Sequence, residues 1–145
     1  MKLIPILLIA SACVAIAACS KDTFETKPKI EIVDYNSRDV VAGQNLNITL
    51  EYFDKEGDLG QGWITAILDR QNLSQRTDSM ATILTYALPD FPPRDKGEIL
   101  LRIPHNSLRH TTFENDTFLI HIFVVDREQN ISDTITTEQI VGVRP

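Results

Sequence analysis

The stretch NLNITLEYF at residues 45–53 decides the fold, because polar and apolar side chains alternate along it from Asn45 to Tyr52. Successive side chains of a β-strand point to opposite faces of the sheet, so one face of this segment is apolar. That face carries Leu46, Ile48, Leu50 and Tyr52. The period of two predicts a half-buried strand, and residues 42–44 supply a turn before it.

Six further segments have the composition of short strands and are bounded by Gly, Pro, Asn or Asp. They span residues 30–34, 63–68, 82–88, 98–103, 117–125 and 131–141. The segment 117–125 is apolar on both faces except for His121, so we expect it to be a central strand. The alternation of the last segment slips between Ile135 and Ile140, which predicts a β-bulge. No segment has a sustained helical period, and about seven strands predict an all-β antiparallel sandwich.

The last predicted hairpin carries a pattern seen in known domains. Val125-Asp126 followed by Asn130-Ile131-Ser132 resembles the end of many bacterial immunoglobulin-like, cadherin-like and fibronectin-type modules, over roughly residues 30–143. The resemblance implies an immunoglobulin-like β-sandwich with Trp63 buried in its third strand. The inter-sheet disulfide of antibody domains is absent.

The first 19 residues have the form of an export signal. Lys2 precedes an apolar run, and Ile16-Ala17-Ala18-Cys19 closes it. The run is shorter than the approximately 20 residues of a membrane span. The motif resembles the bacterial lipobox, which implies cleavage before Cys19 and lipid on its thiol; the alternative is a secretory signal cut after Ala18 that leaves a free thiol. We therefore predict a signal peptide at 1–18, a lipidated tether at 19–29 and a sandwich domain at 30–145.

Localisation follows from the same segment. Ser20-Lys21-Asp22 partly resembles the signal that sends Bacteroidetes-type lipoproteins to the cell surface, which implies a surface-exposed protein on the outer membrane. Two or more acyl chains anchor a protein stably, so the membrane is an expected partner through the lipid on Cys19.

Composition excludes several functions. Without the signal the chain has 13 basic residues (14 less Lys2) against 20 acidic ones, a net charge of −7, so we expect no nucleic-acid partner. Cys13 leaves with the signal, and Cys19 is then the only cysteine. The mature chain therefore has no disulfide, cysteine-based zinc site or catalytic thiol.

Acidic residues in two predicted turns are candidate ligands for calcium, and we expect no other cofactor. Asp54, Glu56 and Asp58 alternate around Gly57, and Asp126 and Glu128 lie in a turn expected at the same end of the sandwich. Calcium binds several oxygen ligands, and the resemblance to cadherin-like modules implies carboxylates gathered at a domain end. The alternative is a solvated acidic turn, partly neutralised by the neighbouring basic residues Lys55 and Arg127.

Phe91 is a candidate binding residue, because it lies among prolines in the stretch 88–97 and a stiff loop can present an aromatic ring to a protein or glycan. The alternative is that its ring covers the open end of the core. The three histidines have no metal-binding spacing, and no Gly-x-Ser-x-Gly motif is present, so we expect no enzymatic activity.

These observations favour a lipid-anchored, non-catalytic binding or adhesion module of the cell envelope that contacts a protein or a glycan. The alternative is a structural or assembly lipoprotein facing the periplasm, with no small-molecule ligand. Asp78-Ser79-Met80 and Asp133-Thr134-Ile135 resemble Bacteroidetes O-glycosylation motifs, which makes Ser79 and Thr134 candidate acceptors.

Overall fold

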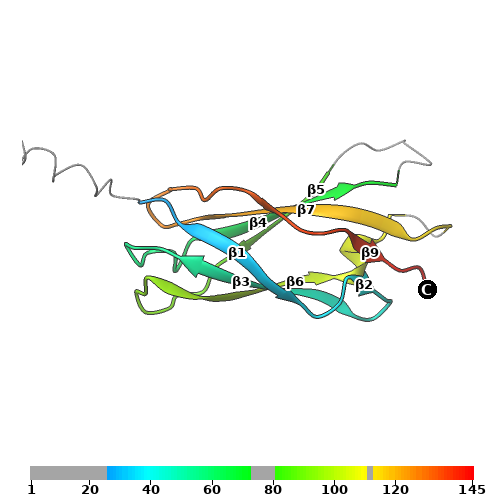
Figure 1. Ribbon diagram of the computed structural model, residues 1–145, viewed down its shortest axis with the longest axis horizontal. Coiled ribbons are helices and arrows are strands. Elements are labelled where there is room, and N and C mark those ends of the chain that lie inside the picture. Colours follow the sequence, from blue (N-terminus) through cyan, green and yellow to red (C-terminus); the bar gives the residue numbers. More distant parts are fainter. Residues whose placement is uncertain (1–25, 73–80, 111–112) are drawn as a thin grey trace, which may run out of the picture.

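Residues 26–72, 81–110 and 113–145 are described by the computed structural model and form two β-sheets packed face to face (Figure 1). The first sheet has the order β1-β3-β6, and the second has the order β2-β9-β7-β4-β5, with β8 also paired to β7. The strands are β1 (Lys29–Tyr35), β2 (Asp39–Val40), β3 (Asn45–Phe53), β4 (Trp63–Arg70), β5 (Thr82–Ala87), β6 (Lys96–Pro104), β7 (Asp116–Val125), β8 (Ile135–Thr136) and β9 (Ile140–Gly142). The predicted all-β, immunoglobulin-like sandwich is confirmed.

The core lies between the sheets and is built on the alternation of β3. Leu46, Ile48 and Leu50 are fully buried, and Tyr52 is 3% exposed. β3 pairs antiparallel with β1 on one side and with β6 on the other, so its apolar face is held over the opposite sheet. Each fully buried Leu or Ile side chain contributes about 1.5–3 kcal/mol through the hydrophobic effect.

β7 is central in the second sheet, as the run of apolar residues predicts. It pairs with β4 along eight residue pairs, from Trp63–Val125 to Arg70–Phe118. Its other side pairs with β8 and β9. This position buries alternate side chains from Asp116 to Val124 and half-buries the intervening ones.

The predicted last strand is interrupted where the sequence alternation slips. Within this segment only Ile131, β8 and β9 pair with β7. At the positions between these paired residues, side-chain hydroxyl groups accept hydrogen bonds from backbone N–H groups of β7. The Ser132 hydroxyl accepts a hydrogen bond from the Val124 N–H at 3.0 Å, and the Thr137 hydroxyl accepts one from the Ile120 N–H at 3.0 Å. Side-chain acceptors thus replace backbone ones where the chain leaves the strand conformation.

Two details differ from the sequence predictions. The short strand β2 was not expected; it pairs parallel with β9, whereas the other strand pairs of the described residues are antiparallel. The expectation of a buried Trp63 is wrong, because its side chain is 47% exposed. The register of β4 turns Ile64, Ala66 and Leu68 into the core, so the odd-numbered position 63 faces outward.

A 3-10 helix, η1 (His105–Leu108), closes the end of the sandwich at which β3 begins and β6 ends. Gly142 of β9 lies against it, since a Cβ at this position would be 1.8 Å from the Leu108 carbonyl oxygen. Beside it, the Arg70 guanidinium forms an ion pair at 2.6 Å with the buried carboxylate of Asp116.

Several sequence predictions concern residues outside the described ranges. These are the signal peptide, Cys19 and its lipid, residues 20–25 of the tether, and the acceptor Ser79. Thr134 is described and exposed. Within the described ranges, the structure holds no helix of the length and apolarity that crossing a membrane requires.

Candidate functional site

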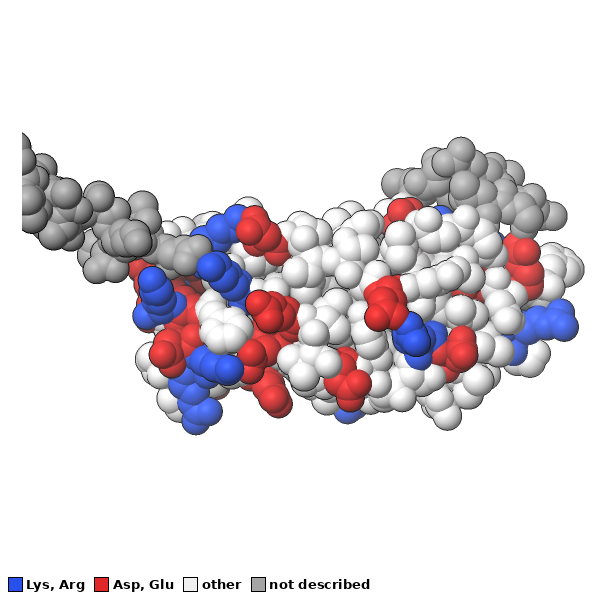
Figure 2. Space-filling model, viewed as in Figure 1, with Lys and Arg blue, Asp and Glu red and all other residues white. Residues whose placement is uncertain are grey.

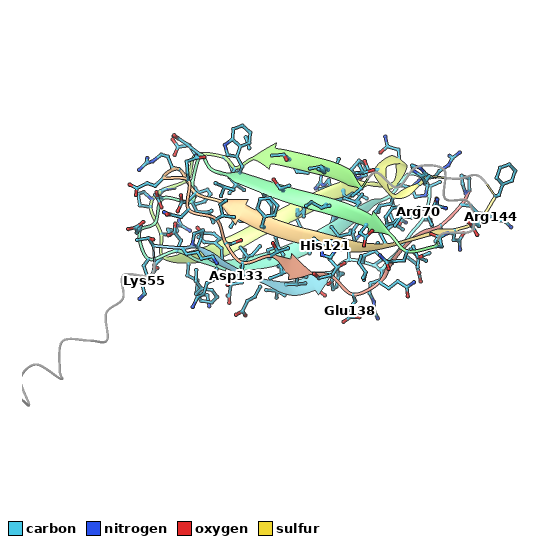
Figure 3. The ribbon with its side chains drawn as sticks, turned by 90° about the horizontal axis from the view of Figure 1, so that it is seen from above. Lys55, Arg70, His121, Asp133, Glu138 and Arg144 are labelled. Atoms are coloured by element: carbon cyan, nitrogen blue, oxygen red, sulfur yellow. The ribbon has the colours of Figure 1, made fainter. Side chains whose placement is uncertain are left out.

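The five predicted acidic ligands come from two loops at one end of the sandwich. Asp54 follows β3 and begins a loop that reaches β4, and Asp126 follows β7 and begins the turn toward Ile131. β1 begins at this same end, since Lys29 pairs with Phe53. Figure 3 labels Lys55 at this end and Arg144 at the other. Figure 2 shows acidic and basic side chains interspersed where β1 begins.

Asp54 organises the first loop. Its carboxylate is 2% exposed and accepts hydrogen bonds from the N–H of Leu59 at 2.8 Å and of Glu56 at 3.3 Å. Gly57 has a φ of +69°, a conformation that side chains disfavour, and its N–H donates to the Asp54 carbonyl oxygen at 3.1 Å. The fully buried Leu59 side chain fixes the loop to the core.

Asp126 organises the second loop in the same manner. Its carboxylate is fully buried and accepts the Asn130 N–H at 2.8 Å and the Asn130 side-chain amide at 2.9 Å. The two loops are joined directly, because the Arg127 N–H donates to the Asp58 carbonyl oxygen at 3.3 Å. The predicted proximity of the two acidic turns is therefore present in the structure.

Three carboxylates converge between these loops. One carboxylate oxygen each of Glu56, Asp58 and Asp126 lies within 4.8 Å of the others. Asp58 is 8% exposed, and neither of its carboxylate oxygens has a hydrogen-bond partner in another residue; only its own backbone N–H acts on the carboxylate. This is unusual, since buried polar groups are normally hydrogen-bonded.

The electrostatics at this point are unfavourable to negative charge. Burial, followed by the charges of Asp126, Asp54 and Glu128, raises the pKa of Asp58 above its ordinary value. Partial desolvation and then the charge of Glu128 raise the pKa of the exposed Glu56. Glu128 therefore lies close enough to act on both groups, although it stands outside the group of three.

The two basic neighbours, Lys55 and Arg127, do not pair with the cluster. Among the ion pairs of the described residues, none joins Lys55 or Arg127 to these carboxylates, and both side chains are exposed. The alternative of a solvated turn suits the exposed Glu56 but leaves the buried Asp58 unexplained. The chemical capacity of the arrangement is to hold a cation with oxygen ligands.

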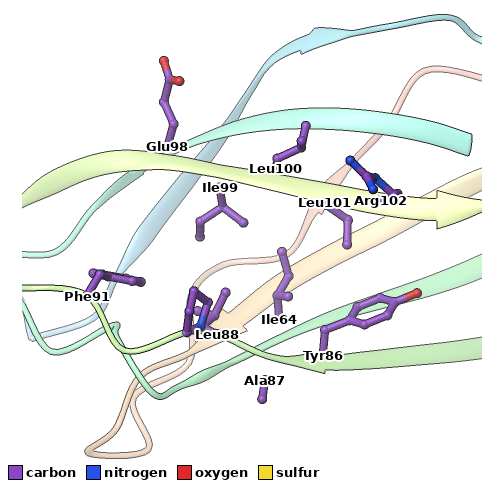
Figure 4. Close-up of a pocket in the computed structure, with 11 residues that line it drawn as sticks. Ile64, Tyr86, Ala87, Leu88, Phe91, Glu98, Ile99, Leu100, Leu101 and Arg102 are labelled. Atoms are coloured by element: carbon purple, nitrogen blue, oxygen red, sulfur yellow. The ribbon is translucent and has the colours of Figure 1, made fainter.

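A second candidate site is a groove of about 390 Å³ between the sheets, at the side where β5 and β6 are the outermost strands (Figure 4). Buried side chains at its base are Ile64, Leu88, Ile99 and Leu101. Tyr86 is 36% exposed and lies along one wall.

Phe91 lies at one end of this groove. Its ring is partly buried against the core, with its centroid 5.7 Å from that of Tyr52. The structure thus shows the alternative in which Phe91 covers the core, and the ring is not presented outward. Sequence reasoning missed the groove and Tyr86, although the mostly exposed burial pattern of β5 marks an edge strand once the sheet order is known.

The groove borders two strand edges that pair with no further strand of the described residues. The His105 N–H donates to the Gln44 carbonyl oxygen and the Asp54 N–H donates to that of Asp95, at the two ends of the β3–β6 ladder. Alternate residues of an antiparallel ladder direct their backbone groups away from the partner strand. In this register those residues of β6 are Glu98, Leu100 and Arg102.

The same argument applies to β5. The Leu88 N–H donates to the Gly62 carbonyl oxygen at 2.8 Å, which fixes the alternation of the β4–β5 ladder. The backbone groups of Ile83, Thr85 and Ala87 therefore point away from β4. Within the described residues, β5 pairs only with β4 and β6 only with β3.

The histidines do not form a metal site with the acidic cluster. His105 Nε2 lies 2.7 Å from the Val143 carbonyl oxygen, and His121 Nδ1 lies 2.9 Å from the Thr136 hydroxyl. In the described part of the chain, the only group of three or more potential metal ligands is the acidic one, and it contains no histidine.

Comparisons with known proteins identify neither a family nor an activity. No family model and no curated protein matches the sequence. A superoxide reductase (neelaredoxin) from Ignicoccus hospitalis is similar in structure, with 10% identity, a TM-score of 0.41 and coverage of 79% of this chain and 78% of that one. β-Glucosidase 3B from Thermotoga neapolitana, in complex with α-D-glucose, has 17% identity and a TM-score of 0.40, over 81% of this chain and 17% of its own. Similarity at these TM-scores supports no transfer of activity.

Proposed function

We propose that the chain is a non-catalytic binding module, held at the outer membrane by lipid on Cys19 and exposed on the cell surface. Its partner in this proposal is a protein, which contributes an extended segment to the groove between β5 and β6. The observation that carries the proposal is the coincidence of an apolar groove with two free strand edges.

The chemistry of the groove suits an extended peptide. A strand added beside β6 would pair with the outward backbone groups of Glu98, Leu100 and Arg102, as in other cases of β-augmentation. Its alternate side chains would then point onto the apolar base formed by Ile99 and Leu101. A volume of about 390 Å³ lies in the range of ligand pockets.

The apolar base of the groove favours a protein partner over a glycan. Sugar hydroxyl groups need hydrogen-bond partners when they leave water, and a buried apolar base supplies none. Apolar peptide side chains gain free energy there, about 25 cal/mol for each Å² removed from water.

Leu100→Pro is expected to weaken partner binding by at least roughly tenfold, because an acceptor left without its donor in the complex costs about 1–3 kcal/mol. Proline removes the outward N–H at this position and leaves the β6–β3 hydrogen bonds intact, because the Leu100 N–H points away from β3. Leu100→Ala is the matched control: it shortens the 57% exposed side chain and keeps the N–H, so binding should be retained.

Binding is measured by photo-crosslinking in native membranes, with a photoreactive residue at Tyr86 and, as a negative position, at Val33 on the opposite edge. The expected result is a crosslinked species from position 86 that persists in Leu100→Ala and disappears in Leu100→Pro. Equal crosslinking in both variants would overturn the groove proposal. Absence of any species at position 86 would favour the structural lipoprotein without a partner in the groove.

A further inference from the structure

We propose that Glu56, Asp58 and Asp126 form a site for a hard divalent cation, with Ca²⁺ as the expected ion. The site shares no residue with the groove. It lies at the end of the domain where β1 begins, which is the end that leads toward Cys19.

The unpartnered carboxylate of Asp58 carries the argument. An ionised carboxylate removed from water without a hydrogen-bond donor is strongly destabilising. Asp58 is 8% exposed, and neither of its oxygens meets a donor of another residue, whereas the buried carboxylates of Asp54 and Asp126 each accept two hydrogen bonds from neighbouring residues. A cation bound between the carboxylates compensates the charge of Asp58.

The ligand geometry permits a shared ion. Oxygens of Glu56, Asp58 and Asp126 lie within 4.8 Å of one another, and ligand oxygens 2.3–2.6 Å from a common ion fall in this separation range. A carboxylate has lone pairs beyond those used in one hydrogen bond each, so Asp126 can bind a cation while Asn130 remains in place. Glu128 adds negative charge beside the three.

The identity of the ion follows from the donor set. All the available ligands are oxygens, which favours calcium or magnesium over the metals that prefer histidine or thiolate. Calcium accepts irregular coordination by six to eight oxygens, and magnesium requires a near-octahedral set. Two loops of unequal length, one contributing Glu56 and Asp58 and the other Asp126, suit the more tolerant ion.

Occupancy of the site would fix three loops together. The first loop already touches the 88–95 connection. A Cβ at Gly57 would be 3.0 Å from the backbone nitrogen of Arg94, and one at Gly60 would be 3.2 Å from the Phe91 carbonyl oxygen. The second loop leads to Asp133, which forms an ion pair with Lys27 just before β1. The cation would therefore stiffen the end of the domain that joins the tether.

The test is the thermal unfolding of the mature lipidated chain in nonionic detergent, with chelator and with Ca²⁺ or Mg²⁺ up to about 10 mM, which covers the weak affinities of extracellular calcium modules. We expect Ca²⁺ to raise the wild-type Tm by roughly 10 °C when its free concentration is about a hundredfold above Kd, and Mg²⁺ to raise it less. Calorimetric titration gives the stoichiometry directly, with one ion per chain expected.

Asp58→Asn separates a cation site from a merely strained loop. In chelator it should melt above the wild type, because an unpaired buried charge is removed, and it should lose the Ca²⁺-dependent increase in Tm. Glu56→Gln, on an exposed side chain, should fold normally and weaken Ca²⁺ binding. Asp34→Asn, an exposed carboxylate on β1, should respond as the wild type does.

Two results would overturn the proposal. One is a wild-type Tm that does not change in Ca²⁺ together with no heat of binding. The other is a full Ca²⁺ response in Asp58→Asn or in Glu56→Gln, which would place the ion elsewhere. If Asp58→Asn does not fold, Glu56→Gln and the calorimetric titration still decide the question.

Discussion

Cys19→Ala is expected to remove the chain from the membrane fraction or to leave it uncleaved. In our proposal the thiol of Cys19 carries the lipid, and alanine has no atom on which acylation can occur. Two or more acyl chains are needed for stable anchoring, so the loss of this attachment is expected to be complete in the cleaved chain. Fractionation followed by mass spectrometry of the N-terminus measures both the location and the cleavage site.

Cys13→Ala is the matched control, since Cys13 lies within the predicted signal peptide. It should be cleaved, lipidated and membrane-bound as in the wild type. A Cys19→Ala chain that remains attached and is cut before residue 19 would contradict the lipid anchor. In wild-type cells, protease added from outside should digest the domain; protection in intact cells and digestion after permeabilisation would favour the periplasm-facing alternative.

Gly142→Ala is expected to destabilise the domain by about 3 kcal/mol or more. A Cβ at this position would be 1.8 Å from the Leu108 carbonyl oxygen and 2.9 Å from its carbonyl carbon, and both are backbone atoms of η1. Gly142 also pairs with Val40 of β2 and with Asp116 of β7. Neither side can yield without moving η1 or a sheet strand.

Gly43→Ala provides the comparison for this prediction. Gly43 has a φ of +82°, and a Cβ at this position would meet no atom within 4 Å, so the only cost is that of the left-handed conformation, about 1 kcal/mol. Urea unfolding of the two variants gives both free energies. A Gly142→Ala chain as stable as Gly43→Ala would mean that η1 does not pack on β9 as described.

Local pattern explains which parts of the fold were predictable. The bounds of the strand at 45–53 follow from alternation alone, and the central place of 117–125 follows from its apolar faces. β2 has two residues and pairs with a strand about a hundred positions away, so it has no local signature. The resemblance to immunoglobulin-like domains implies a buried Trp63, but the register of β4 turns its even-numbered residues inward and leaves Trp63 exposed.

The acidic end was predictable in position and not in chemistry. Turn residues showed that Asp54, Glu56 and Asp58 lie in one loop, and sandwich topology placed Asp126 and Glu128 beside them. Whether a carboxylate is satisfied depends on donors brought by tertiary structure: Leu59 donates to Asp54, and no other described residue donates to Asp58. The groove could not be predicted from the sequence, because it lies between β5 and β6, which are edge strands of two different sheets.

Hydrogen exchange at the β6 edge tests the proposed binding function most directly. The amides of Glu98, Leu100 and Arg102 point away from β3, so they should exchange fast in the purified chain, and those of Ile99 and Leu101 should exchange slowly. In native outer-membrane preparations, where the partner is present, the account predicts strong protection of the first three amides and no change in Val33 on the opposite edge. Fast exchange at Leu100 in both preparations would contradict the proposal that β6 receives a partner strand.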